Sequence, residues 1–230
     1  MAKTSNLNNI LKTLKVKSSM KQDVFDETYK VFKDFKTRLE KIATKLKEEV
    51  SGYDDRLGIE YTERGDYEVE FKIAGDVLIF FMHTNVFKFG EDLAISKTDY
   101  AQEDEARRFC GTISVYNFLA DSLKYSRMND LGYMIARIFV NREQHYFVEG
   151  KGQLGFLYDQ FETDKIDASA IDRIIESVMA YTLEFDLLTP PYDQVQEVSV
   201  HAVHEATKYL SIKTGKRVGY GFQADSDSIA

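Results

Sequence analysis

The sequence predicts an α+β fold: a long N-terminal helix, then a mainly antiparallel sheet of about five to seven strands, then two C-terminal helices. Three observations lead to this prediction. A helical repeat of apolar residues fills residues 20–50, alternating apolar and polar residues dominate the middle of the chain, and helical spacing returns after residue 170. Consecutive strand-like segments are typical of an antiparallel sheet with its helices set apart, and not of alternating β-α-β units.

The long helix is predicted from a seven-residue repeat. Phe25, Phe32, Leu39 and Leu46 form one row, and Phe35 and Ile42 complete a second one. Ser51 and Gly52 provide the stop, because glycine readily adopts the left-handed conformation that follows a helix. Such a stripe either lies on the sheet or pairs with the same helix of a second chain, and the bulky Phe row favours the sheet.

Strands are expected next along the chain. Residues 57–61 and 67–73 alternate around a turn at 64–66, which predicts a hairpin, and the run 77–82 is apolar on both faces, as in a central strand. Further strands are predicted at 111–119, 133–140 and 145–148, with a returning strand at 154–158, while the polar segment 91–108 is predicted as helix or loop.

Two helices are predicted to close the fold. Ile171, Ile174, Ile175, Val178, Met179 and Leu183 mark the first helix, and Val195, Val198, Ala202, Ala206 and Tyr209 mark the second. Pro190 and Pro191 must interrupt them, because proline cannot continue a helix.

Length and composition favour a single domain. The 230 residues are 43% hydrophobic and contain no Pro/Gly/Ser-rich linker, so one sizeable core is expected. We divide the chain into a basic N-terminal arm or short helix (1–19), one α+β domain (20–222) and a flexible acidic tail (223–230).

Charge and apolar content restrict the partners. A net charge of −8 argues against nucleic acid, whose phosphates need clustered basic residues, and no apolar run is long enough to span a bilayer. We therefore expect a cytoplasmic protein with neither nucleic acid nor a membrane as partner. Lys3, Lys12, Lys15, Lys17 and Lys21 all precede the first acid, which predicts a solvated basic arm or, alternatively, a docking arm. The single Cys110 is interpreted as a buried structural thiol.

The segment Gly150–Gly155 matches the phosphate-binding pattern G-x-G-x-x-G. A dinucleotide site needs a helix directly after the glycines, whereas residues 156–158 are predicted as strand. We therefore interpret these glycines as a hairpin turn.

Arg137 is flanked by Ile135 and Phe139 on one face of an otherwise apolar strand. It either pairs with a carboxylate inside a closed core or lines a pocket and binds an anionic ligand, with His83 and His145 as candidate proton-transfer groups. The convergence of these three residues depends on the strand order.

Glu197, His201 and His204 share one face of the second C-terminal helix and are the candidate metal ligands. Lys208 lies on the same face, which opposes a metal ion, so a solvated face or a subunit contact is the preferred interpretation. No cofactor is indicated by the sequence.

The chain carries no G-x-S-x-G, Walker or C-x-x-C motif. We therefore expect a non-enzymatic interaction or assembly protein that self-associates or binds another protein, through the aromatic helix or the closing helices. The alternatives are a module that senses a small anionic ligand and an enzyme of metal-dependent or acid–base type.

Overall fold

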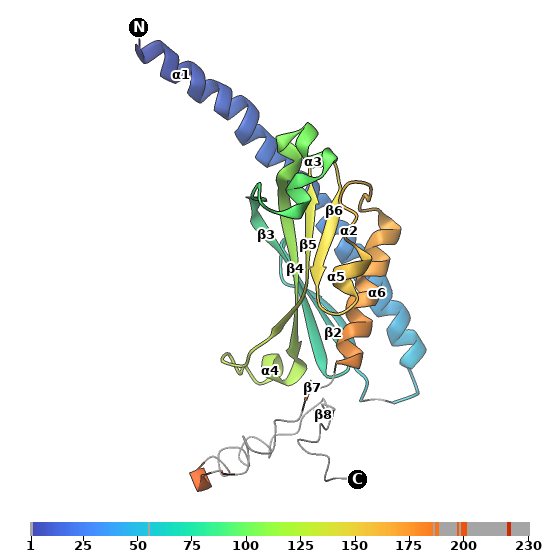
Figure 1. Ribbon diagram of the computed structural model, residues 1–230. Helices are drawn as coiled ribbons and strands as arrows, with labels where there is room; N and C mark the ends of the chain where they lie inside the picture. Colours follow the sequence, from blue (N-terminus) through green and yellow to red (C-terminus); the bar gives the residue numbers. More distant parts are fainter. Residues whose placement is uncertain are drawn as a thin grey trace, which may run out of the picture.

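A six-stranded antiparallel sheet with two long helices on one face forms the body of the computed structural model (Figure 1). The structure describes residues 2–54, 56–185, 187–188, 197, 199–201 and 220–221. It confirms the predicted α+β class, the long N-terminal helix and the antiparallel sheet.

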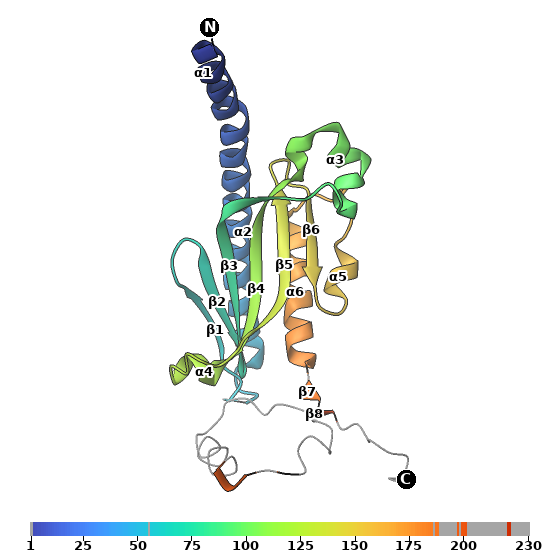
Figure 2. The ribbon, with the colours of Figure 1, turned by 60° about the vertical axis from the view of Figure 1, so that its left-hand side comes forward.

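The N-terminal helix is longer than the repeat predicted. Helix α1 (Ala2–Thr13) continues through a π-helical turn, η1 (Leu14–Ser18), into α2 (Ser19–Val50). The turn that follows contains Gly52 at φ 80°, as expected of a residue just after a helix. Figures 1 and 2 both show α2 lying along the sheet and α1 projecting beyond it.

The aromatic stripe of α2 is buried against the chain's own sheet. Phe32, Phe35 and Leu39 are fully buried, which confirms packing on the sheet. Helix and sheet approach closely where Gly111 faces Thr28, because a Cβ at Gly111 would overlap the Thr28 side chain. Glycine in this strand therefore allows the contact between helix and sheet.

The strands follow one another across the sheet in chain order, so each pairs with its sequence neighbours. They are β1 (Ile59–Glu63), β2 (Glu68–Ile73), β3 (Asp76–Lys88), β4 (Phe109–Leu119), β5 (Tyr133–Asn141) and β6 (Tyr146–Gly150). The predicted polar segment between β3 and β4 forms η2 (Ala94–Lys97), α3 (Asp99–Glu103) and η3 (Glu105–Arg108), while α4 (Ala120–Lys124) connects β4 to β5. Outside this sheet, β7 (Leu187–Leu188) pairs with β8 (Tyr220–Gly221).

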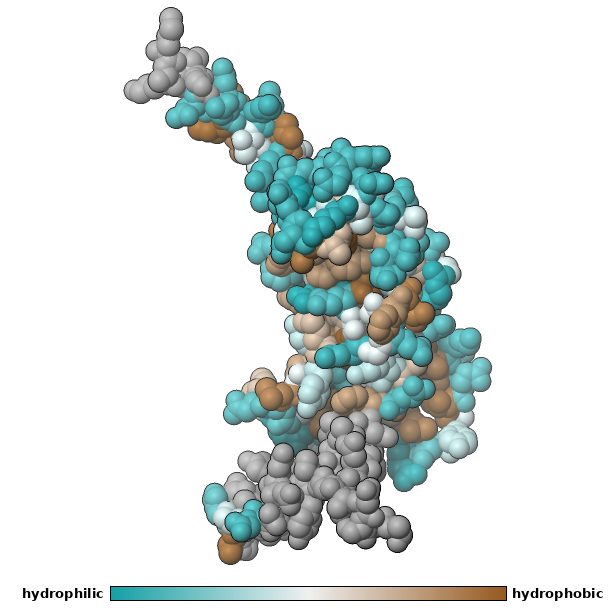
Figure 3. All heavy atoms as spheres, in the orientation of Figure 1, coloured by the Kyte–Doolittle hydropathy of each residue, from teal (hydrophilic) through white to brown (hydrophobic). Residues whose placement is uncertain are grey.

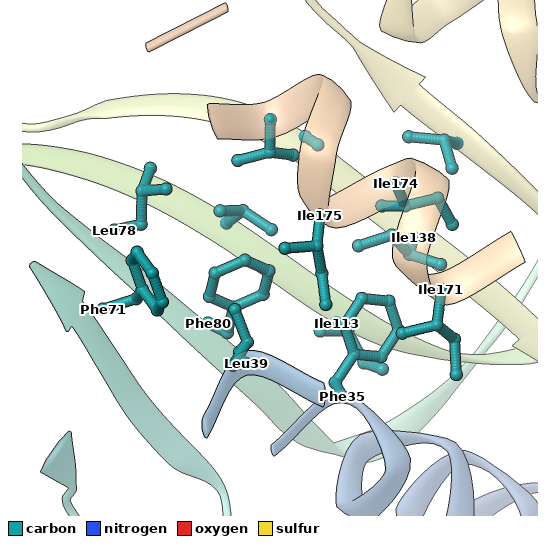
Figure 4. Close-up of a cluster of buried hydrophobic side chains, with 14 of the residues drawn as sticks. Phe35, Leu39, Phe71, Leu78, Phe80, Ile113, Ile138, Ile171, Ile174 and Ile175 are labelled. Atoms are coloured by element: carbon teal, nitrogen blue, oxygen red, sulfur yellow. The ribbon is translucent and has the colours of Figure 1, made fainter. Parts of the chain in front are cut away.

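Helix α6 (Ala168–Glu184) lies beside α2 on the same face of the sheet. Its start is capped by Asp167, whose side chain accepts a hydrogen bond of 2.7 Å from the Ala170 N–H. Figure 4 shows Ile171 and Ile175 of α6 pointing toward Phe35 of α2, and Ile174 lying near Ile138 of the sheet. An ion pair between Arg38 and Asp172 links the two helices further. The second predicted C-terminal helix lies largely outside the described residues, and the predicted tail lies wholly outside them.

The predicted strand at 154–158 is wrong, because Leu154–Leu157 forms the short helix α5. Gly152, at φ 56°, turns the chain after β6 ends. Only Leu154 and Tyr158 of this segment are buried, a spacing of one helical turn, whereas a strand would bury every second residue. The turn at the glycines is correct, but it leads into a helix and does not form a hairpin.

A β-bulge in β5 changes which face of the sheet its side chains occupy. Val115 pairs with Ala136 but Tyr116 pairs with Met134, so Ile135 is an extra residue in the ladder. Ile135 consequently joins the core beneath the helices, and Met134 takes the face that carries Arg137. The expectation that Ile135 and Arg137 share a face is wrong for this reason.

Candidate functional site

The face of the sheet opposite α2 and α6 carries a groove of about 730 Å³. Figure 2 views the sheet with both helices behind it. Strands β3, β4, β5 and β6 form the floor of the groove, and Phe89, Leu93 and Ile95 of the segment after β3 form part of its wall. In Figure 3, apolar side chains lie exposed between polar regions of the body.

Strand register places the floor residues in two rows. Phe81, Ser114, Arg137 and Glu149 are successive cross-strand partners, and His83, Thr112, Phe139 and Phe147 form the adjacent row. Side chains of cross-strand partners lie on the same face, so four strands contribute to one surface. Arg137 and His83 therefore line the same groove, as the ligand-binding hypothesis required.

Arg137 is both paired and part of the groove. Its Nε and Nη2 atoms lie 3.0 and 2.6 Å from Glu149 Oε2, and its guanidinium lies 5.6 Å from the centre of the Phe139 ring. Its Nη1 has no hydrogen-bond partner within the described part of the chain. Arg137 thus has a carboxylate partner on an open face of the sheet and not inside a closed core, and its Nη1 retains donor capacity.

His83 is held in a defined tautomer by the backbone. The N–H of Asn85 donates to His83 Nδ1 at 3.0 Å, so the neutral ring carries its proton on Nε2. Phe87 packs edge-on against the imidazole, with ring centres 5.0 Å apart. His83 therefore adds one N–H donor to a mostly apolar lining.

His145 does not reach the groove. It precedes β6 and is buried, with its ring stacked on Tyr100 at a centre distance of 4.3 Å. Its Nδ1–H donates to the carbonyl of Phe161 at 2.9 Å. The structure separates His145 from Arg137 and His83 and gives it packing contacts, so it does not join them in one site.

A polar network surrounds the Tyr100 ring that His145 contacts. The Tyr100 hydroxyl accepts a hydrogen bond from Asn141 and donates one to Glu143, each at 2.9 Å, and burial raises the pKa of Tyr100. Burial also acts to raise the pKa of Glu143, but the hydrogen bonds from Tyr100 and Arg107 outweigh it and lower that pKa. This network joins α3 to the turn between β5 and β6.

The metal triad predicted at Glu197, His201 and His204 stays a prediction, because the structure describes only part of it. Glu197 and His201 are exposed, and His204 lies outside the described residues. Within the described residues no group of three or more His, Cys, Asp or Glu side chains has the arrangement of a metal site. Cys110 is fully buried, as predicted, and burial raises the pKa of its thiol, so the reactive thiolate is disfavoured.

A second cavity of about 650 Å³ lies over β1, β2 and α4. Much of its charged lining is paired internally, since Arg64 lies 3.0 Å from Glu70 and Lys72 pairs with Glu60. The groove differs from it by its apolar floor, and we therefore take the groove as the candidate site.

Several groove residues were not foreseen from the sequence. Phe81 and Phe87 are 37% and 41% exposed, which is unusual for large aromatic side chains. Thr112 is buried at the groove, and its hydroxyl has no hydrogen-bond partner among the described residues. The one available signal was the unusual density of aromatic residues between 80 and 89, which the prediction of a fully buried strand concealed.

No protein-family model matches the chain, and neither a curated protein nor a solved structure matches it. None of the helices in the described part combines the length and apolarity needed to cross a bilayer. The groove itself is therefore the feature that points to a function.

Proposed function

We propose that this chain is a non-enzymatic interaction protein that self-associates, with the groove on the open sheet face as its contact surface. The observation that carries the proposal is the exposure of aromatic side chains on the face opposite the core. Apolar surface gathered in one place marks an interaction site more often than scattered apolar residues do.

The composition of the groove fits a protein contact. Its lining includes Phe, Tyr, Met and Arg, which are enriched at the centres of protein interfaces. The aromatic stripe of α2 is a possible contact surface from the sequence alone, but its side chains are buried in the core of the same chain. We therefore propose the open sheet face as the contact surface for self-association.

Substitution of exposed groove aromatics tests this proposal. We expect the full chain to form oligomers by light scattering, and Phe81→Glu or Phe87→Glu to raise the dissociation constant at least about tenfold. Phe156→Glu is the matched control, because Phe156 is 81% exposed and lies outside the groove lining. A monomeric wild type, or equal effects of the groove and control variants, would contradict the proposal.

A second candidate function is binding of a small anionic ligand with an apolar body. It is favoured by the Arg137 Nη1 and His83 Nε2 donors and by a groove volume within the range of about 300–1,000 Å³ typical of ligand sites. Dodecanoate, but not dodecanol, is then expected to raise the melting temperature, and Arg137→Met should abolish the increase. Equal stabilisation by both compounds would rule out an anion site.

A further inference from the structure

The N-terminal arm, residues 6–18, is a helix that lies apart from the body. Each of these residues is exposed. Leu7, Ile10, Leu11 and Leu14 nevertheless recur at helical spacing, and at 100° per residue they fall within an arc of about 100°. The arm therefore presents an apolar stripe that the described part of the chain does not cover.

An uncovered stripe on a short helix calls for a partner. Most helical stability in proteins comes from packing of an apolar face, and the stripe of the arm has no such packing among the described residues. The arm joins α2 without a break, so it cannot fold back over its own groove while this helix is intact (Figure 1). Since no described residue covers the stripe, another molecule is the source of cover that we consider.

Charge selects among the possible partners. Residues 1–22 contain five lysines and no acid, which leaves 25 basic and 38 acidic residues in 23–230, a formal charge of −13. Pairing of two arms would bring two sets of lysines together, whereas an arm on the body of a second copy brings opposite charges together. The groove itself is mixed in charge, because Lys88 and Arg137 line it beside Glu149. The negative charge that opposes the basic arm therefore belongs to the body as a whole, including the exposed Glu91 and Asp92 before the wall residue Leu93.

We infer that the apolar stripe of the arm docks into the groove of a second copy of this chain. Helices with apolar residues at positions i, i+3, i+4 and i+7 bind apolar grooves in this way. Reciprocal exchange of arms between two copies gives a closed two-fold dimer, so the contact does not propagate into a filament. The inference rests on the proposed function and names the segment that occupies the groove.

A mixing experiment with two full-length variants tests the inference. The arm variant carries Leu7→Ser and Leu11→Ser with an intact groove, and the groove variant carries Phe87→Glu with an intact arm. All three positions are exposed, so the fold is expected to persist, and Val16→Ser is the control because Val16 is 63% exposed and lies off the stripe. Native mass spectrometry should find each variant monomeric alone and a heterodimer in the 1:1 mixture, because one arm and one groove remain complementary.

The other outcomes overturn the inference in distinct ways. If the arm variant still dimerises while the groove variant does not, the groove meets another surface and only the proposed function survives. If the groove variant dimerises while the arm variant does not, the arms pair with each other and both proposals fail. If the wild type is monomeric but sediments with phosphatidylglycerol vesicles through Leu7 and Leu11, the partner of the arm is a bilayer and both proposals also fail.

Discussion

At the residue scale, Glu143 connects α3 to the sheet through a carboxylate that is charged in the folded protein. Its pKa is lowered below the ordinary value of 4.5 in the folded state. A carboxyl group with a lowered pKa stabilises the fold above its unfolded pKa, and this stabilisation is lost as the pH falls through the folded pKa. Acid should therefore weaken the Tyr100 network below about pH 4.5.

Glu143→Gln should lower the free energy of unfolding by about 1 kcal/mol at pH 7, because Gln keeps the shape but loses the charge-assisted hydrogen bonds. The difference from wild type should be smaller at pH 3 than at pH 7, because the stabilisation is lost as the pH falls from the unfolded pKa toward the lowered folded pKa. Urea denaturation at both pH values measures it, with the exposed Glu162→Gln as control. A difference that does not change with pH would show that the charge of Glu143 is not involved.

The contact of Gly111 with Thr28 is the second residue-scale feature with a measurable consequence. Gly111→Ala places a methyl group where the Thr28 side chain lies, and overpacking of this kind costs about 1–3 kcal/mol. Addition of Thr28→Ala should recover part of the loss, so the two substitutions should be less than additive in chemical denaturation. Strict additivity would mean that α2 does not press on β4 at this point.

At the scale of elements, the strong periodic patterns were predictable and the irregular positions were not. The helix over 20–50 and the helix around 171–183 follow from repeated apolar residues, and the strands follow from alternation. The bulge at Ile135 leaves no periodic signal, because a single inserted residue is decided by pairing with β4. The length of β3 beyond Met82 was also missed, since His83 and Asn85 interrupt the apolar run that indicated the strand.

Packing of α6 against the sheet and α2 gives the element-scale prediction. Ile174 is fully buried in the core shown in Figure 4, so Ile174→Ala should lower the free energy of unfolding by about 2–5 kcal/mol. Leu183→Ala on the same helix is the matched control, because Leu183 is 56% exposed. Similar losses in the two variants would contradict the placement of α6.

At the scale of the whole molecule, the candidate site was predictable only in part. Arg137 could be singled out because a charged residue in an apolar strand requires a partner or a ligand, and His83 because it ends an apolar run. Whether they share a surface depends on strand order and register, which local patterns do not determine. His145 was misplaced for the same reason, since its position before β6 puts it beside Tyr100 and outside the groove.

The separation of charge between arm and body predicts that association depends on salt. Residues 1–22 carry five lysines and no acid, whereas residues 23–230 have a formal charge of −13, and interactions between exposed charges are screened beyond about 10 Å at 0.1 M salt. Analytical ultracentrifugation should therefore show a dissociation constant that rises severalfold between low and high sodium chloride. Lys12→Glu with Lys15→Glu should weaken dimerisation at low salt, and a dimer that tightens with salt would argue for an apolar contact alone.

The most direct test of the central claim is the native mass of the full chain, measured beside Phe87→Glu at the same concentration of about 100 μM. Self-association through the groove predicts a wild-type dimer and a monomeric variant with an unchanged circular dichroism spectrum. A monomeric wild type, or a variant that remains dimeric, would contradict the claim that the open sheet face is the contact surface.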